Sequence, residues 1–104
     1  MDDIEILHIY GQDMWHVPAY IAGNRAALIA LADAISDALS NGVGSMAAFQ
    51  NDGEGFNAIV VLADEEEADK LVPAYDIEYA TGKDGDISPS KLAGEKFTKI
   101  LDGE

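Results

Sequence analysis

The sequence contains no cysteine and few basic residues. Because a disulfide, a thiolate nucleophile and a Cys-ligated zinc all need cysteine, these three kinds of chemistry are excluded. Six Lys and Arg stand against 20 Asp and Glu, so the formal net charge is -14. Such a negative field repels nucleic-acid phosphates and anionic lipid head groups, which excludes a broad nucleic-acid or membrane footprint. A basic protein partner or a small, locally held ligand is compatible with this charge.

The chain also lacks long apolar runs and the common catalytic motifs. No run approaches the ~18 residues of a membrane span, and the first residues have neither the basic nor the apolar part of a signal peptide. We therefore expect a cytoplasmic protein. HExxH, P-loop and GxGxxG patterns are missing, and Asp84-Gly85-Asp86 is only a fragment of a calcium loop. These absences favour a protein that is not an enzyme and that binds no metal or cofactor.

The residues that are present predict one α+β domain over 1–104. With 48% hydrophobic and 25% charged residues, the composition is that of an ordinary globular protein. Alternating or continuous apolar stretches predict strands over 4–10, 19–22, 45–50 and 56–62, with a candidate edge strand over 76–80. Helices are predicted over 25–39, from Asp64, and from Ser88-Pro89. We expect a mostly antiparallel sheet of four to five strands, with one long helix and two shorter helices packed on it.

The long helix has the clearest signals. Leu28, Leu31, Ile35 and Leu39 fall three or four residues apart, which predicts the buried stripe. Asn24 is a good N-cap, and Asn41-Gly42 supplies a left-handed stop. The strand over 4–10 is apolar on both faces and is predicted to be well covered, as is the run 58–62 in the middle of the sheet.

Arg25 is the most informative single residue. It is the only Arg in the protein and the only base among residues 1–69, which hold thirteen acids. It follows Gly23-Asn24 in the first helical turn, where the helix dipole disfavours a cation. Free amides at a helix start, a glycine that allows close approach and a guanidinium fork together suit a phosphate or a carboxylate. The alternative is that Arg25 pairs with a nearby acid.

Aromatic residues lie just before this helix. Trp15, His16 and Tyr20 flank the turn, and such rings hold a nucleobase by stacking or simply fill a core. The segment Asp52-Gly53-Glu54-Gly55-Phe56 is either a hairpin turn or a loop that closes over a ligand. His8, on a strand, is expected to be a partly buried structural histidine.

These residues resemble a known group. The pattern Trp15-x-x-Pro18-Ala19-Tyr20-Ile21-x-Gly23-Asn24-Arg25, followed by residues 52–56, is similar to small, mostly uncharacterised proteins encoded in phages and prophages. The Gly-Asn start and Leu-rich helix also resemble some small bacterial immunity proteins. Small acidic phage proteins without enzyme motifs include sponges that defeat Thoeris and CBASS immunity by sequestering nucleotide signals.

The resemblance implies an anti-defence protein that binds an ADP-ribose derivative or a cyclic nucleotide without catalysis, in the host cell cytoplasm. We expect a homo-oligomer, because a pocket shared between copies buries more of a ligand. The expected ligand-binding residues are Trp15, His16, Tyr20, Gly23, Asn24, Arg25 and Phe56.

Two other hypotheses stay open. An acidic immunity or inhibitor protein would cover a basic surface on a protein partner with Asp64, Glu65, Glu66, Glu67 and Asp69. Enzymatic cleavage of the signal, with His8 or His16 as a base, is the third.

Overall fold

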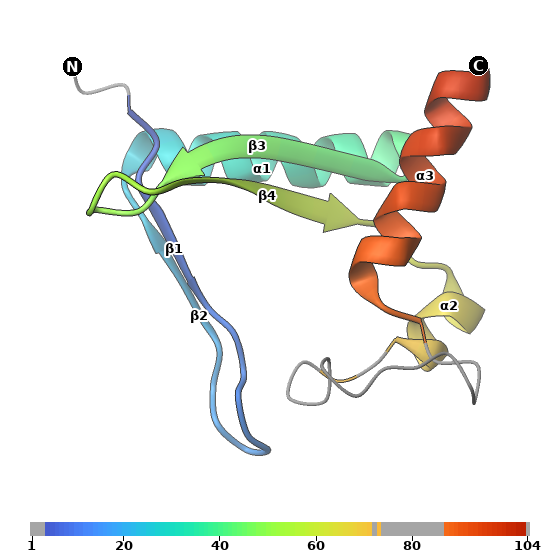
Figure 1. Cartoon of the computed structure of the whole chain (residues 1–104), viewed down its shortest axis with the longest axis horizontal. Coiled ribbons are helices and arrows are strands. Elements are labelled where there is room, and N and C mark those ends of the chain that lie inside the picture. The colour runs from blue at the N-terminus through green and yellow to red at the C-terminus, as the bar shows by residue number, and fades with distance from the viewer. Residues whose placement is uncertain (1–3, 72, 74–86, 104) are drawn as a thin grey trace.

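The computed structural model describes residues 4–71, 73 and 87–103, and these form strands and helices in the order β1 β2 α1 β3 β4 α2 α3 (Figure 1). The strands are β1 (Leu7–Tyr10), β2 (Tyr20–Gly23), β3 (Val43–Phe49) and β4 (Gly55–Val61). The helices are α1 (Arg25–Asn41), α2 (Glu65–Lys70) and α3 (Pro89–Gly103). The α+β class predicted from the sequence is confirmed, and the candidate strand over 76–80 lies outside the described residues.

The single sheet of four to five strands is wrong for the described part of the chain. Strand β1 pairs antiparallel with β2, and β3 pairs antiparallel with β4, so two separate two-stranded sheets form. They meet where Ile6 bridges to Phe49 and the Phe49 amide donates to the Glu5 carbonyl over 2.9 Å. Each hairpin pairs strands that are close in sequence, and β1 diverges from β3 directly after this bridge.

Helix α1 covers one face of the β3–β4 sheet (Figure 1). The core beneath it is built from Leu7, Ala27, Met46, Ala48 and Ala58. A Cβ added to Gly44 would overlap the carbonyl oxygen of Ala34, so the helix and β3 are in backbone contact there. Small residues make this contact possible because larger side chains would hold the two backbones apart.

The same close contact overturns the predicted buried stripe of α1. Its fully buried residues are Ala27, Ala34 and Ala38, whereas Leu28 and Ile35 are each 44% exposed and Leu39 is 67% exposed. Only the alanines fit against the backbone of β3, so Leu28, Ile35 and Leu39 lie away from the sheet. Leu31, the fourth residue of the predicted stripe, is half-buried against the core. The predicted caps are nevertheless confirmed, because Asn24 accepts from the Ala27 amide and Gly42 has φ +100°.

Two strand predictions need correction. Strand β4 is expected in mid-sheet, yet among the described residues it is one of only two strands in its sheet, and Ile59 is 49% exposed. Strand β1 was expected to be covered, yet beyond the buried Leu7 it runs into an arm that projects from the rest of the molecule (Figure 1). We call residues 7–23 the arm. Both corrections arise because pairing stops at two strands, which leaves faces without a neighbouring layer.

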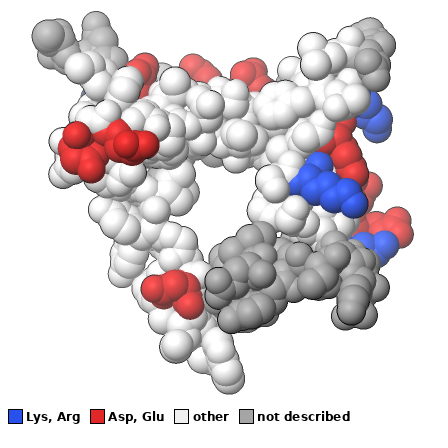
Figure 2. Space-filling view, viewed as in Figure 1, with Lys and Arg blue, Asp and Glu red and all other residues white. Residues whose placement is uncertain are grey.

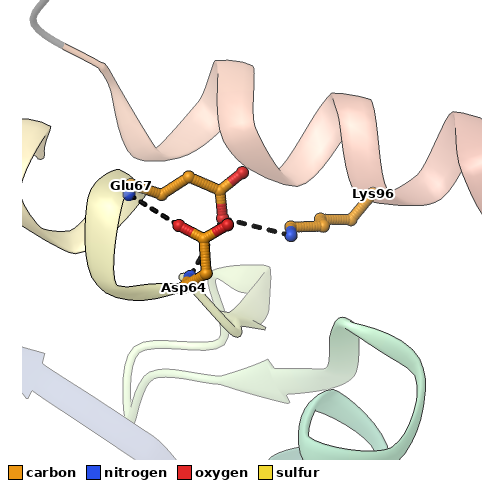
Figure 3. A network of polar contacts seen from close by, with 3 residues as sticks. All are labelled: Asp64, Glu67 and Lys96. Carbon is orange, nitrogen blue, oxygen red and sulfur yellow. Dashed lines mark hydrogen bonds and ion pairs between the residues drawn. The ribbon is translucent and has the colours of Figure 1, made fainter.

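Helices α2 and α3 lie beyond the far end of β4. Asp64 caps α2 in a reciprocal capping box with Glu67, and a Glu67 carboxylate oxygen also lies 3.3 Å from the Lys96 ammonium of α3 (Figure 3). The N-terminal signal of α3 is confirmed, since the Ser88 hydroxyl accepts from the Lys91 amide over 3.3 Å. Leu92 anchors α3 by burial.

Candidate functional site

Asn24 joins the foot of the arm to the start of α1. Its Oδ1 accepts from the Ala27 amide over 2.9 Å and from the Ile6 amide over 3.3 Å, while its Nδ2 donates to the Ile4 carbonyl over 2.9 Å. The Asn24 amide donates to the Ile6 carbonyl over 3.1 Å. These bonds orient the helix start, and they occupy the side-chain groups that the sequence analysis assigned to a ligand.

Gly23 has a structural reason to be glycine. A Cβ at this position would lie 2.9 Å from the Ile6 carbonyl oxygen, 3.1 Å from Leu7 Cδ1 and 3.2 Å from the Ala27 Cβ. Strand β2 therefore passes close to both β1 and α1, and a larger residue would push the arm away from the helix start. Gly23 thus affects the site indirectly, because it allows β2 to lie close to β1 and to the start of α1.

Arg25 lies at the mouth of an apolar hollow. It is exposed, and together with Leu28, Ile29 and Ala32 it lines an open hollow of about 440 Å³. Within the described ranges, no carboxylate forms an ion pair with Arg25. Leu28, Ile29 and Ala32 are not among the ligand-binding residues expected from the sequence, although their spacing of three, four and seven residues from Arg25 places them on its face of the helix.

The predicted aromatic residues occupy the outer part of the arm. Trp15 is 68% exposed and Tyr20 is 61% exposed. The Trp15 and His16 rings lie 5.9 Å apart with a tilt of 53°, and His16 has φ +66°. Positive φ is unfavourable for a residue with a Cβ and recurs at functional turns. The arm thus presents flat rings on an unusually shaped turn.

The structure does not bring these rings to Arg25 within one chain. Strand β2 separates Tyr20 from Asn24 by four residue steps, a rise of roughly 13 Å, and Trp15 lies farther out on the arm. A ligand that contacts both the rings and the guanidinium must bridge this distance or meet residues of two copies.

Phe56 belongs to a different place. It is half-buried against the core and, with His8, Ile9, Tyr10 and Gln50, lines a separate hollow of about 350 Å³. The His8 and Tyr10 rings stack with centroids 6.0 Å apart. His8 Nε2 accepts from the Asn51 amide over 3.2 Å, as expected for a partly buried structural histidine. Residues 50–54 form the β3–β4 turn, in which Gly53 has φ +92°, and Gly55 and Phe56 already belong to β4.

The acidic cluster over 64–69 has two kinds of member. Asp64 and Glu67 already have partners within the chain: they form the capping box of α2, and Glu67 also forms an ion pair with Lys96. Glu65, Glu66 and Asp69 are exposed, and Glu66 lies 3.7 Å from Lys70. Figure 2 shows that Lys and Arg on this face gather beside these helices, while the arm is mostly uncharged. The positive charge visible near α2 therefore reduces the field of the cluster.

Among the described residues, no group of three or more His, Cys, Asp or Glu side chains is arranged to hold a metal ion. In the same part of the chain, no helix combines the length and the apolarity that a membrane span requires.

Comparison with known proteins adds no assignment. No protein-family model matches the chain, and no curated protein or solved structure is significantly similar to it. Function must therefore be argued from the residues and their geometry.

Proposed function

We propose that this protein is a phage-type anti-defence protein that binds and sequesters a nucleotide-derived immune signal. The ligand is an ADP-ribose derivative or a cyclic nucleotide, it is released unchanged, and the protein acts as a homo-oligomer in the host cytoplasm. The observation that supports the proposal is the placement of Arg25, the only Arg of a -14 chain, beside an apolar hollow at the start of α1.

In this hollow Arg25 offers a charged donor for a phosphate, while Leu28 and Ile29 offer apolar surface for another part of the ligand. The hollow of about 440 Å³ is open to solvent, so a ligand there stays largely exposed unless a second surface covers it. A guanidinium offers paired donors to a phosphate, and the N-terminus of α1 adds partial positive charge. Contacts at ~3 Å act well inside the ~8 Å Debye length, so a local cation can hold a small anion on an acidic protein.

The exposed rings of the arm supply the other half of the recognition. Trp15 and Tyr20 offer flat faces for a base, and stacking of this kind contributes about 1–3 kcal/mol per base. His16 lies beside Trp15 and can donate to the rim of the base. Asn24 and Gly23 hold the arm and α1 in position and act on the ligand indirectly.

Calorimetry with ADP-ribose and with cyclic dinucleotides tests the binding. A hydrogen-bonded charge contributes about 1.5–3 kcal/mol, so Arg25→Ala should weaken affinity by roughly 10- to 100-fold. Lys99→Ala makes the same change of charge on exposed α3 and should leave affinity unchanged. Equal losses in the two variants, or no binding by the unmodified protein at micromolar concentration, would refute the proposal.

The fate of the ligand distinguishes sequestration from catalysis. The protein is incubated with the signals, separated from them, heated, and the released compounds are identified. We expect the intact signal. A cleaved product would instead support the enzymatic hypothesis, with His8 or His16 as the first residues to substitute.

A second candidate function is supported by the exposed Glu65, Glu66 and Asp69 on α2. An acidic inhibitor that uses them would bind a basic protein in a salt-sensitive manner and ignore nucleotides. A Glu65→Gln, Glu66→Gln, Asp69→Asn variant would then lose the protein partner, whereas nucleotide sequestration predicts that its affinity for ADP-ribose is unchanged.

A further inference from the structure

The folded chain exposes more surface than its mass accounts for. Its accessible area is 7431 Å², whereas a compact monomer of 11.1 kDa exposes roughly 5,700 Å². The radius of gyration is 14.9 Å, against roughly 13 Å for a compact chain of this length. The excess of roughly 1,700 Å² per chain is larger than the about 800 Å² that each partner buries in a standard interface.

Part of this excess is the outer face of α1, which we define as Arg25, Leu28, Ile29, Ala32, Ile35 and Leu39. At 100° per residue these positions form one continuous face that lies about 80–160° around the helix from the buried alanines. All of them are exposed, and Arg25 is the only charged residue among them. Large aliphatic side chains at helical spacing normally form a packing face, and nothing in the described part of the chain covers this one.

The arm is the second uncovered apolar surface. It carries one charged side chain, Asp13, in a protein with 26. Its exposed large hydrophobic residues are Ile9, Tyr10, Met14, Trp15, Val17, Tyr20 and Ile21. Depletion of charge with enrichment in Tyr, Trp and Met is the composition of an interface core. A two-stranded hairpin is also marginally stable alone, so it needs a surface to pack on.

We propose that a second copy of this chain covers both surfaces, with the arm of each copy packed on the outer face of α1 of the other. Each copy has a net charge of -14, so two copies repel each other. They must therefore associate through surfaces that lack acidic residues. The outer face has none, and the arm has only Asp13. Helix α1 runs for roughly 25 Å and can receive the arm along its length. Two-fold symmetry repeats the contact, so both arms and both helices are covered at once.

In this arrangement the partner's arm closes over the hollow beside Arg25, so the ligand lies between the rings of one copy and the guanidinium of the other. In one chain, Trp15 and Tyr20 lie along the arm away from Arg25, but packing the arm on a partner helix brings them to the partner's Arg25. A base stacked on one copy and a phosphate held by the other would then belong to one ligand. This second step rests on the proposed function, whereas the dimer itself does not.

Size-exclusion chromatography with light scattering measures the mass of the protein in solution and so tests the dimer directly. We expect a mass twice the 11.1 kDa of the chain at micromolar concentration, reduced to 11.1 kDa by Tyr20→Glu in the arm or by Ile29→Glu on the outer face. Leu101→Glu, at an 85% exposed apolar position of α3, is the matched control and should remain dimeric. Circular dichroism verifies that each variant is folded. A monomeric mass for the unmodified chain would overturn the proposal.

Because the chain has no cysteine, the contact can be mapped by disulfide formation. Differently tagged Tyr20→Cys and Ile29→Cys chains are mixed and oxidised, and we expect a cross-linked heterodimer. A mixture of Leu101→Cys with Ile29→Cys should give none. A dimer by light scattering that forms no link between arm and outer face would refute this arrangement.

Mixing two binding-deficient variants tests the shared site. Trp15→Ala and Arg25→Ala should each bind ADP-ribose weakly, but their mixed dimers contain one site with both native residues. About a quarter of the full binding capacity should therefore return on mixing. No recovery would place both residues of a site in one copy and overturn the shared site. A dimer that binds neither ADP-ribose nor a cyclic dinucleotide would refute the proposed function and leave the dimer standing.

Discussion

Gly44 is the residue on which the packing of α1 depends most directly. Its missing Cβ leaves room for the carbonyl oxygen of Ala34, so Gly44→Ala must push the helix away from β3. We expect a loss of about 3 kcal/mol in the free energy of unfolding, at the upper end of the range for overpacked cores. Denaturant-induced unfolding measures this loss.

Gly94 provides the matched control within the same chain. It lies inside α3, is exposed, and a Cβ there would meet nothing within 4 Å. Gly94→Ala should therefore stabilise the protein by about 0.5–1 kcal/mol, because alanine restricts the unfolded chain and favours helix. Effects of the same sign in the two variants would contradict the packing described for Gly44.

Asn24 supports two elements at once, and its substitutions separate the two roles. Asn24→Ala removes the cap of α1 and the link to Ile4, with an expected loss of about 1–2 kcal/mol. Asn24→Asp keeps the capping oxygen and loses only the Nδ2 donor, so its loss should be smaller. Thermal unfolding of both variants measures this difference, with the exposed Asn57→Ala as a control near zero. A larger loss for Asp than for Ala would refute the capping role.

At the scale of elements, Glu67 couples α2 to α3. One carboxylate oxygen accepts from the Asp64 amide over 3.0 Å and also faces the Lys96 ammonium. The Lys96 side chain passes over Gly42 as well, so it reaches the end of α1. A six-residue helix is too short to be stable alone, and these contacts therefore decide whether α2 persists.

Hydrogen exchange of the α2 amides should follow this dependence. Glu67→Ala removes both contacts and should speed exchange at Asp64 and Glu67, while Glu67→Gln retains an acceptor for the cap and should speed it less. Lys96→Met keeps the aliphatic packing and removes only the charge, at a cost below about 1 kcal/mol for a partly exposed pair. Unchanged exchange in Glu67→Ala would show that the capping box contributes nothing.

At the scale of the whole molecule, association should appear as concentration-dependent stability. When unfolding is coupled to dissociation, the melting temperature rises with protein concentration. We expect such a rise for the unmodified chain and for Leu101→Glu, and a constant, lower melting temperature for Ile29→Glu. Scanning calorimetry over a hundredfold concentration range measures it. A melting temperature independent of concentration in the unmodified protein would argue against a dimer.

The candidate site was only partly predictable from the sequence. The rarity of Arg25 and its place in the first helical turn were visible in the pattern of charges. Phe56 was expected from the sequence to contact the same ligand as Arg25. In the structure it lines a different hollow, together with His8 and Tyr10. Which residues from distant parts of the sequence share a hollow depends on the path of the arm, and no local sequence pattern predicts that path.

By itself, the sequence determined the local features of this protein. The cap at Asn24, the left-handed stop at Gly42 and the turn at Gly53 are set by backbone chemistry within a few residues, and all three are present. Tertiary structure alone decided which face of α1 packs on the sheet, because both the leucine stripe and the alanine stripe are apolar. Close contact with the backbone of β3 at Gly44 selects the alanines and leaves Leu28, Ile35 and Leu39 outside.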